Sequence, residues 1–335
     1  GEAHVLHVGL AHTADVLVIA PCTANTLAKL AYGLADNLLT ITALANRAPL
    51  LLAPAMDGGM YDAPATQKNL AALGERGATI IGPAEGHLAS GLSGRGRMLE
   101  PNEIIGQLRL LLGRNGALAA KKVVISAGGT QEPLDPVRML TNRSSGRQGY
   151  ALAQAALDAG AKVTLVSAST SLTPPSGARV VQVETARQML QAVLAESASA
   201  DALIMAAAVA DFRPKRSARN KLKKRDGIPQ LELEATEDIL QAVVKQKAGK
   251  KHPKVVVGFA AESRDLLANA SEKLKSKKLD LIVANDITAS DAGFGTETNR
   301  VTLLFKKGKQ ESLPLMSKTE VAETIVARLA ALLEP

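Results

Sequence analysis

A dense basic run is the feature of this sequence best suited to binding an anionic substrate. Residues 213–225, RPKRSARNKLKKR, hold eight Lys and Arg side chains. The run follows residues 206–211, AAAVAD, whose small side chains at the end of an expected strand leave space for a flat ring or a ribose. Ligands of open α/β sheets bind at such carboxyl ends. We therefore interpret the run as a basic lid over a phosphate-rich substrate, with a solvated surface loop as the alternative.

Two glycine-containing turns are suited to holding phosphate groups. Gly128 and Gly129 follow an expected strand, and Ser144, Ser145 and Gly146 precede an expected helix. Backbone N–H groups in such turns and at helix N-termini bind anions. Neither turn has the spacing of the dinucleotide-binding or Walker fingerprints. A purely structural role for these glycines is an equal alternative.

Positive charge is concentrated in the second half of the chain. The 335 residues carry a formal net charge of +8, yet residues 1–115 hold 8 Lys and Arg against 9 Asp and Glu. Beyond the basic run, Lys273 and Lys277 are four residues apart, so a helix places both on one face. We therefore expect two halves with different ligands, the second half binding a nucleotide and a phosphorylated substrate.

The elements that position these residues alternate between strand and helix patterns. The predicted strands cover residues 15–21, 49–54, 79–83, 121–126, 162–167, 179–183, 202–207, 255–259, 279–284 and 301–305, and the predicted helices cover residues 24–34, 66–77, 149–160 and 319–333. This pattern predicts two Rossmann-like, three-layer α/β domains with mainly parallel sheets. We place them at residues 1–113 and 121–335, joined by a glycine-containing linker over residues 114–120.

The composition excludes several classes of protein. Hydrophobic residues make up 46% of the chain and charged residues 21%, which excludes a disordered chain. No apolar run reaches the ~18 residues of a membrane helix. The single cysteine, Cys22, excludes an intrachain disulfide and suits a reducing cytoplasm. Aromatic residues, at 2%, offer few surfaces for base stacking, which disfavours nucleic acid as a partner.

Five segments of the second half are distinctive: ISAGGTQEPLDPVRMLTNRSSGRQGYALA (125–153), AAAVADFRP (206–214), NKLKK (220–224), VVGFAAES (256–263) and IVANDI…GFGTETN (282–299). In these segments residues 121–335 resemble the phosphopantothenate–cysteine ligase domain of the bifunctional coenzyme A biosynthesis family. The resemblance implies that CTP, with Mg²⁺, activates the carboxylate of 4′-phosphopantothenate as an acyl-cytidylate. The amine of cysteine then attacks to form the amide.

The resemblance also implies roles for individual residues. Asn142 would hold the activated acyl group, with Arg138 close by. The CTP-binding residues would be Ala206, Ala207, Ala208, Asp211, Lys221, Asp238, Ile239, Phe259, Lys273 and Lys277. From the sequence alone, Phe259 is equally a core aromatic residue and Asp238 a helix N-cap. No protein ligand for Mg²⁺ is assigned, and we expect the CTP phosphates to hold most of its coordination.

Four segments of the first half are equally distinctive: HVGLAHTAD (7–15), APCTANTLAKLAYGLADNLL (20–39), PAMDGGMY (54–61) and GHLASGLSGRGRM (86–98). They resemble the flavodoxin-like, FMN-dependent phosphopantothenoylcysteine decarboxylase of the same family. The resemblance implies that His7 is catalytic, although its local pattern alone indicates a surface residue. The flavin or the decarboxylase substrate would contact Thr23, Ala24, Asn25, Met56 and Asp57.

The flavin-phosphate-binding strand, loop and helix that open this family do not precede residue 7. We therefore expect a fragment, with a decarboxylase half that binds FMN weakly or not at all.

Two positions depart from the commoner family pattern. Asp57 stands where many members have Asn, and a carboxylate there repels a substrate carboxylate unless it is protonated or bridged. Ser90 stands at the position of a proton-donating cysteine, and a hydroxyl is a far weaker acid than a thiol. The final reduction would therefore need another proton donor. The surrounding glycines remain, which favours a variant branch of the family.

We therefore expect a cytoplasmic coenzyme A biosynthesis enzyme whose partners are 4′-phosphopantothenate, cysteine and CTP. The family resemblance implies self-association, with a dimeric ligase and a trimeric decarboxylase. One alternative is a non-catalytic regulatory or scaffold protein that keeps the nucleotide-binding fold. A weaker alternative is a nucleic-acid-binding protein that uses residues 213–225.

Overall fold

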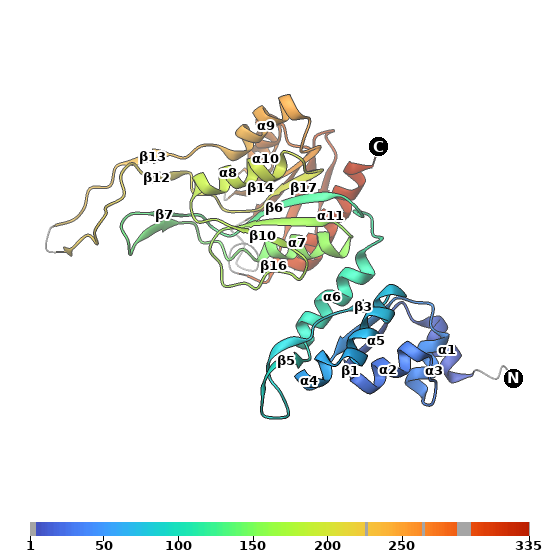
Figure 1. The fold of residues 1–335 in the computed structure, drawn as a ribbon. Coiled ribbons are helices and arrows are strands. Elements are labelled where there is room, and N and C mark those ends of the chain that lie inside the picture. Colours follow the sequence, from blue (N-terminus) through green and yellow to red (C-terminus); the bar gives the residue numbers. More distant parts are fainter. Residues whose placement is uncertain (1–4, 225–226, 263–264, 287–295, 335) are drawn as a thin grey trace. The chain divides into compact units, whose positions relative to one another are not determined.

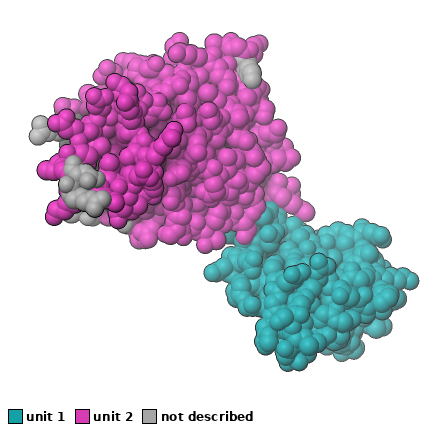
Figure 2. Space-filling view, turned by 60° about the vertical axis from the view of Figure 1, so that its left-hand side comes forward, with its two compact units in different colours: residues 1–112 teal, residues 113–335 magenta. Residues whose placement is uncertain are grey.

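The chain divides into two compact units, residues 1–112 and residues 113–335 (Figure 2). The computed structural model describes residues 5–224, 227–262, 265–286 and 296–334. Residues 225 and 287–295, which belong to the basic run and to the last of the distinctive segments, therefore lie outside the described residues. Within the described ranges, no helix is long and apolar enough to cross a membrane.

Unit 1 is built on a parallel sheet with the order β1-β2-β3. Its elements are α1 (Leu6–Thr13), β1 (Leu17–Cys22), α2 (Ala24–Tyr32), α3 (Leu38–Ala45), β2 (Leu50–Pro54), α4 (Gly58–Asp62), α5 (Pro64–Glu75), β3 (Thr79–Ile80), β4 (Ala84–His87), β5 (Ser93–Arg97) and α6 (Pro101–Gly113). Leu51 and Leu52 of β2 are fully buried, because side chains on both faces of this central strand pack into apolar clusters.

Unit 2 is built on an eight-stranded sheet with the order β10-β9-β6-β11-β14-β15-β17-β18. Its strands are β6 (Lys122–Ala127), β9 (Lys162–Ser167), β10 (Arg179–Gln182), β11 (Ala202–Met205), β14 (Val255–Glu262), β15 (Leu281–Asp286), β17 (Val301–Phe305) and β18 (Gln310–Ser312), and its helices are α7 (Arg147–Asp158), α8 (Ala186–Ser197), α9 (Ile239–Lys250), α10 (Leu266–Ser276) and α11 (Lys318–Leu333). All pairs from β10 to β15 are parallel, and the last two pairs are antiparallel. The predicted α/β class with mainly parallel sheets is confirmed.

The order of the strands reverses between β6 and β11, which makes this pair the topological switch point of the sheet. From β6 the chain proceeds to β9 and β10 on one side, and from β11 it proceeds to β14 and β15 on the other. The loops at the two carboxyl ends therefore diverge and leave a crevice, where ligands of open α/β sheets bind.

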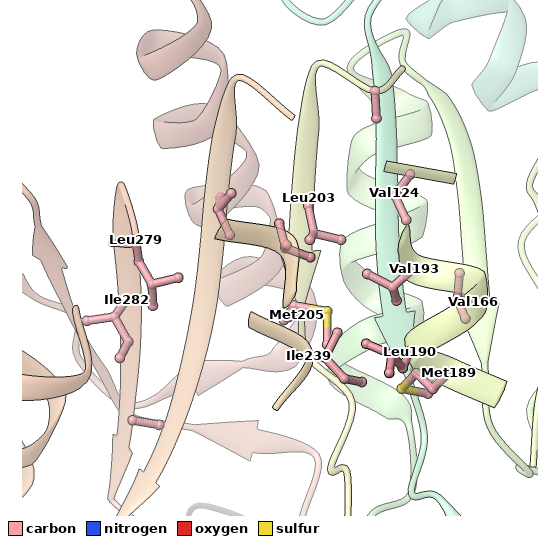
Figure 3. Close-up of a cluster of buried hydrophobic side chains, with 14 of the residues drawn as sticks. Val124, Val166, Met189, Leu190, Val193, Leu203, Met205, Ile239, Leu279 and Ile282 are labelled. Carbon is pink, nitrogen blue, oxygen red and sulfur yellow. The ribbon is translucent and has the colours of Figure 1, made fainter. Parts of the chain in front are cut away.

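A large apolar cluster holds helices α8, α9 and α10 against one face of this sheet (Figure 3). Met189 and Val193 of α8 pack in the same cluster as Val124 of β6 and Leu203 of β11. Met189, Val193 and Leu203 are fully buried, so each removes its whole side chain from water. This packing fixes the strands whose ends carry the loops around the crevice.

Two short hairpins leave the sheet of unit 2 and form an arm (Figure 1). One pairs β7 (Gln131–Pro133) with β8 (Met139–Thr141), and the other pairs β12 (Phe212–Pro214) with β13 (Leu233–Ala235). Ion pairs join Arg213 to Glu234 and Lys215 to Glu232 across the second hairpin. The basic run thus begins as a strand of the arm.

Residues 114–120, expected as a linker, form turns that pack against unit 2. Leu118 is fully buried, and its N–H donates to the carbonyl of Ala159 at 2.7 Å. A Cβ on Gly116 would lie 2.6 Å from the same oxygen, so only glycine allows this close approach.

Candidate functional site

A cavity of about 540 Å³ lies at the carboxyl ends of the central strands of unit 2. Residues 206–209 after β11, residues 142–149 at the start of α7, and residues 236–240 at the start of α9 line it. Residues 259–261 of β14 form another part of the wall, with Lys273 of α10 and Lys277 just after that helix. The cavity therefore occupies the switch point of the sheet.

Most of the residues predicted for the ligase site, from the glycine turns or from the family resemblance, lie at this cavity. Those lining it are Asn142, Ser144, Ser145, Gly146, Ala206, Ala207, Ala208, Asp211, Asp238, Ile239, Phe259, Lys273 and Lys277. Four assigned residues do not line it, namely Gly128, Gly129, Arg138 and Lys221.

The two glycines after β6 lie beneath the cavity wall. Gly128 has a φ of +82°, and a Cβ there would lie 2.9 Å from the carbonyl oxygen of Ala168. A Cβ on Gly129 would lie 3.0 Å from the carbonyl oxygen of Asn142. A larger residue at position 128 would therefore displace the backbone at Ala168, and one at position 129 would displace Asn142 of the cavity wall. Their observed role is to let neighbouring backbone segments approach closely.

Arg138 and Lys221 belong to the arm. The buried carboxylate of Asp135 accepts the N–H groups of Val137 and Arg138 at 2.8 Å and of Leu222 at 3.1 Å. The Arg138 guanidinium also donates to the Leu222 carbonyl at 3.0 Å. Burial alone would raise the pKa of Asp135, but these N–H donors and Arg138 lower it. The carboxylate thus ties the two segments to each other, and neither reaches the cavity.

Asn142 is placed by its own side chain. Its amide nitrogen donates to the carbonyl of Val209 at 3.1 Å, which ties the start of the α7 loop to the segment after β11. The amide oxygen has no partner among the described residues and remains available to a ligand. Asn142 therefore bridges two walls of the cavity.

Asp238 serves both as a helix cap and as a cavity residue. Its carboxylate accepts the N–H of Gln241 at 2.9 Å, which caps α9, and it pairs with the Lys277 ammonium at 2.5 Å. Burial would raise the pKa of Asp238, but Lys277, the Gln241 N–H and Lys273 lower it. Lys273 also donates to the Phe259 carbonyl at 2.9 Å. Lys273 of α10 and Lys277, the residue that follows the helix, therefore place two held ammonium groups at the cavity, and that of Lys277 is paired with Asp238.

Sequence reasoning did not single out several polar residues of the cavity. Gln148 Oε1 and Asn285 Oδ1 are buried and have no hydrogen-bond partner among the described residues. Buried acceptors are normally satisfied, so both atoms indicate a ligand that donates hydrogen bonds. Gln148 lies in the distinctive segment 125–153, and this membership was the sequence feature that could have identified it as a site residue. Lys318, also lining the cavity, is 8% exposed, and burial lowers its pKa.

In unit 1 the turns after β1 and β2 lie side by side. The N–H of Ala55 donates to the Cys22 carbonyl at 3.1 Å, which brings residues 23–25 next to residues 55–57. Thr23 caps α2 by accepting the N–H of Thr26 at 3.2 Å. The structure therefore gathers the predicted flavin and substrate residues Thr23, Ala24, Asn25, Met56 and Asp57 at one edge of the sheet.

The β4–β5 hairpin covers this edge. The Met56 N–H donates to the Gly96 carbonyl at 3.0 Å, and a Cβ on Gly96 would lie 2.1 Å from the Met56 oxygen, so the contact requires glycine. Ser90, between β4 and β5, donates its hydroxyl to the Asp57 carboxylate at 2.7 Å. The Ser90 hydroxyl, together with the Gly59 N–H, lowers the pKa of Asp57. The two departures from the family pattern are therefore hydrogen-bonded to each other.

His7 has no described contact with the residues at this edge of the sheet. It is a half-buried residue of α1, and no hydrogen bond joins it to another residue that the structure describes. Helix α1 packs mainly against α3. The contacts described for His7 therefore do not connect it to Asp57 or Ser90.

No cluster of three His, Cys, Asp or Glu residues suited to a metal ion occurs in the described part of the chain. Three carboxylates nevertheless line the cavity of unit 2, those of Asp211, Glu237 and Asp238. Oxygen donors of this kind suit Mg²⁺ when substrate phosphates supply further ligands.

Comparisons with known proteins assign both units. The family described as DNA/pantothenate metabolism flavoprotein C-terminal domain matches residues 118–333, and the family described as Flavoprotein matches residues 1–112. A coenzyme A biosynthesis bifunctional protein from Bacillus subtilis is 46% identical over 98% of this chain and 80% of its own length. A cysteine/cysteine sulfinic acid decarboxylase from an unknown prokaryotic organism is 44% identical over 97% of this chain and 91% of its own.

A solved structure agrees with these relationships. The crystal structure of the C-terminal domain of a coenzyme A biosynthesis bifunctional protein has a TM-score of 0.56 and 40% identity, covering 65% of this chain and 98% of its own. The chain belongs to the family of the coenzyme A biosynthesis bifunctional proteins.

Proposed function

We propose that unit 2 joins 4′-phosphopantothenate to cysteine with CTP as the activating co-substrate, and that unit 1 decarboxylates the product with FMN. The observation that carries the ligase proposal is the cavity at the switch point of the sheet. It combines the fixed lysines of α10, the carboxamide of Asn142 and two buried acceptors without partners, Gln148 Oε1 and Asn285 Oδ1.

The cavity supplies what the first half-reaction needs. The ammonium groups of Lys273 and Lys277, with the N–H groups at the start of α7, would neutralise the triphosphate. The side chains of Ala206–Ala208 leave room for the nucleoside, and the carboxylate of Asp211 would accept hydrogen bonds from its hydroxyl or amino groups. The substrate carboxylate then attacks the α-phosphorus, and pyrophosphate leaves. Mg²⁺ would be held by the phosphates, with Asp211 and Glu237 of the cavity lining as further carboxylate donors, since Asp238 is paired with Lys277.

The second half-reaction places the acyl group beside Asn142. Its amide nitrogen is already engaged with Val209, so the amide group has a fixed orientation toward the acyl-cytidylate. The cysteine amine attacks the acyl carbon, CMP leaves, and the amine loses a proton. Arg138 and Lys221 would take part only if the arm reached the cavity, and the contacts described for the arm hold them elsewhere.

The polar edge of unit 1 fits a flavin next to a substrate. Thr23 and Asn25 are exposed at the start of α2, next to the Met56–Asp57 turn. When bound there, FMN would accept electrons from the thiol end of the substrate and return them after decarboxylation. The hydroxyl proton of Ser90 is engaged by the Asp57 carboxylate, so this pair would orient a substrate and another group would donate the final proton.

We also propose that unit 2 self-associates through its arm. Phe212, Leu233 and Met139 of the two hairpins are about half exposed, and Ile228 is 96% exposed. Large apolar side chains exposed together on one arm favour an association surface. Sedimentation of the wild type against a Phe212→Ser/Ile228→Ser variant tests this, because the variant should shift the protein toward the monomer.

The decisive experiment measures pyrophosphate release from the purified chain. Release over many turnovers that requires CTP, 4′-phosphopantothenate and cysteine together supports the ligase, because without cysteine the acyl-cytidylate forms only once per site. Equal release with ATP would contradict the preference for cytidine. Normal CTP binding without any turnover would favour the alternative, a non-catalytic protein that keeps the nucleotide-binding fold.

A further inference from the structure

A second cavity of unit 2 lies outside the proposed nucleotide site. It has a volume of about 710 Å³ and lies between α10 and the β17–β18 hairpin. Its apolar lining includes Leu274 and Leu279, both buried, together with Leu304 and Phe305. An apolar surface of this kind suits a hydrocarbon chain or a ring.

The same cavity is bordered by four lysines and, among the described residues, by no acid. Lys275 and Lys278 come from the end of α10 and the turn after it, and Lys306 and Lys309 come from the hairpin. Lys306 lies 3.5 Å from the Asp280 carboxylate, and the Lys309 ammonium lies 5.5 Å from the centre of the Phe305 ring. Among the described residues Lys275 has no ion-pair partner, and neither has Lys278. Asp280 therefore offsets the charge of Lys306, and Glu311 lies close enough to Lys309 to interact with it, so the unpaired positive charge of the border comes from Lys275 and Lys278.

An apolar interior with a cationic border matches one class of ligand. Such a ligand has a hydrocarbon body that displaces water from the leucines and an anionic head that meets the ammonium groups. A lysine ammonium group does not impose the planar geometry of a guanidinium. It can therefore bind either a carboxylate or a phosphate. We propose that this cavity binds a small amphipathic anion and that its occupancy alters nucleotide binding through α10.

Helix α10 supplies the physical connection between the two cavities. Leu274 and Lys275 border the second cavity, while Lys273 and Lys277 line the first. The lysines of the first cavity are held by the Phe259 carbonyl and the Asp238 carboxylate. A ligand that displaces α10 changes both contacts. Coupling between two sites is reciprocal, so CTP must change the affinity for the anion by the same factor.

Calorimetric titration of the full chain with decanoate tests the binding site. We expect one saturable site per chain, with decyl phosphate binding at the same place and decanol, which lacks the charge, binding much more weakly. Lys275→Glu/Lys278→Glu should weaken decanoate binding by about tenfold or more.

Lys122→Glu/Lys162→Glu is the matched control, since these exposed lysines are register partners at the start of β6 and β9 and the charge change is equal. The control should bind decanoate like the wild type. Ala268→Trp should fill the cavity without changing its charge, and should therefore weaken decanoate binding. It provides a second test if Lys275→Glu/Lys278→Glu does not fold.

The proposal is wrong if the binding of decanoate does not saturate, or if Lys275→Glu/Lys278→Glu binds decanoate with the affinity of the wild type. It is also wrong if decanol binds as tightly as decanoate. Self-association that the reversed variant abolishes would make a second copy of the chain the occupant and would also overturn the proposal.

The coupling part rests on the proposed function and is measured separately, as the affinity for CTP with and without saturating decanoate. An unchanged affinity contradicts the coupling. Failure of CTP to bind even without decanoate contradicts the proposed function, while the decanoate titration still decides the second site.

Discussion

At the scale of single residues, Asn142 gives the most direct test of the ligase proposal. Its amide nitrogen is fixed on Val209, and its oxygen is open to a ligand. Asn142→Ala should lower amide formation by about 100-fold or more, as removal of one polar group that stabilises a reacting acyl centre does. The affinity for CTP should stay close to that of the wild type, because the lysines of α10 are untouched.

Product formation and calorimetric CTP titration measure the two quantities separately. Asn102→Ala, at an exposed position on α6, is the control and should leave both unchanged. Retained ligation in Asn142→Ala would show that its role was misassigned.

The Ser90–Asp57 hydrogen bond predicts a measurable change in acidity. The Ser90 hydroxyl and then the Gly59 N–H lower the pKa of Asp57, so Ser90→Ala should raise that pKa toward its ordinary value. A lowered pKa in the folded state adds stability above the unfolded-state pKa of about 3.9, and this stability is lost as the pH falls through the folded-state pKa. The acid dependence of stability should therefore be shallower in Ser90→Ala.

A ¹³C NMR titration of the Asp57 carboxyl measures the shift directly. Ser93→Ala, in the same hairpin, is the control, because Ser93 contacts the ring of His87 rather than Asp57. An Asp57 pKa that stays the same in Ser90→Ala would show that the hydrogen bond does not form in solution.

At the scale of elements, the contact between α7 and β6 depends on Gly149. A Cβ there would lie 2.5 Å from the Cβ of Ala127 and 3.0 Å from the carbonyl oxygen of Ser126. Gly149→Ala should therefore destabilise the protein by about 1–3 kcal/mol through overpacking, and should loosen the adjacent cavity wall. Thermal or denaturant unfolding measures this.

The control is Gly249→Ala in helix α9, where an added Cβ has free space. A Cβ on Gly249 of α9 would meet nothing within 4 Å, so Gly249→Ala should stabilise the helix by up to about 1 kcal/mol. A Gly149→Ala variant as stable as the wild type would show that α7 can shift away from the sheet at little cost.

Strong sequence patterns predicted some elements, and weak patterns left others out. Helix α11 was predicted over residues 319–333 and covers Lys318–Leu333, because its apolar residues recur at helical spacing. Helix α3, LLTITALA, was not predicted. Apolar side chains occur on all of its faces, so the sequence shows no alternation between an apolar and a polar face at helical spacing. Its capping box, formed by Asn37 and Thr40, was the available signal.

At the scale of the whole molecule, the proposed ligase site belongs to one unit. Among the residues that the structure describes, all those that line the cavity come from unit 2, from Asn142 to Lys318. A fragment of residues 113–335 should therefore fold and bind CTP with the affinity of the full chain. The cut at residue 113 keeps the turns around Leu118, which pack on the unit.

Circular dichroism establishes folding of this fragment, and calorimetry compares its affinity for CTP with that of the full chain. A folded fragment with a much weaker affinity would show that unit 1 contributes to nucleotide binding.

The sequence by itself determined the α/β class, most strands of both sheets and the segments that carry the family resemblance. These follow from local patterns, since buried parallel strands need continuous apolar runs and turns need glycine. The resemblance also assigned ligand roles to Asn142 and to residues 206–208, and the structure places these residues on the wall of one cavity.

Only the tertiary structure decided which distant side chains touch. It joined Ser90 to Asp57, joined Arg138 to Leu222 within the arm, and buried the open acceptors of Gln148 and Asn285 in one cavity. The physical reason is that loops and hairpins carry no periodic pattern. Their positions depend on hydrogen bonds and packing between segments far apart in the chain, which no local run of residues encodes.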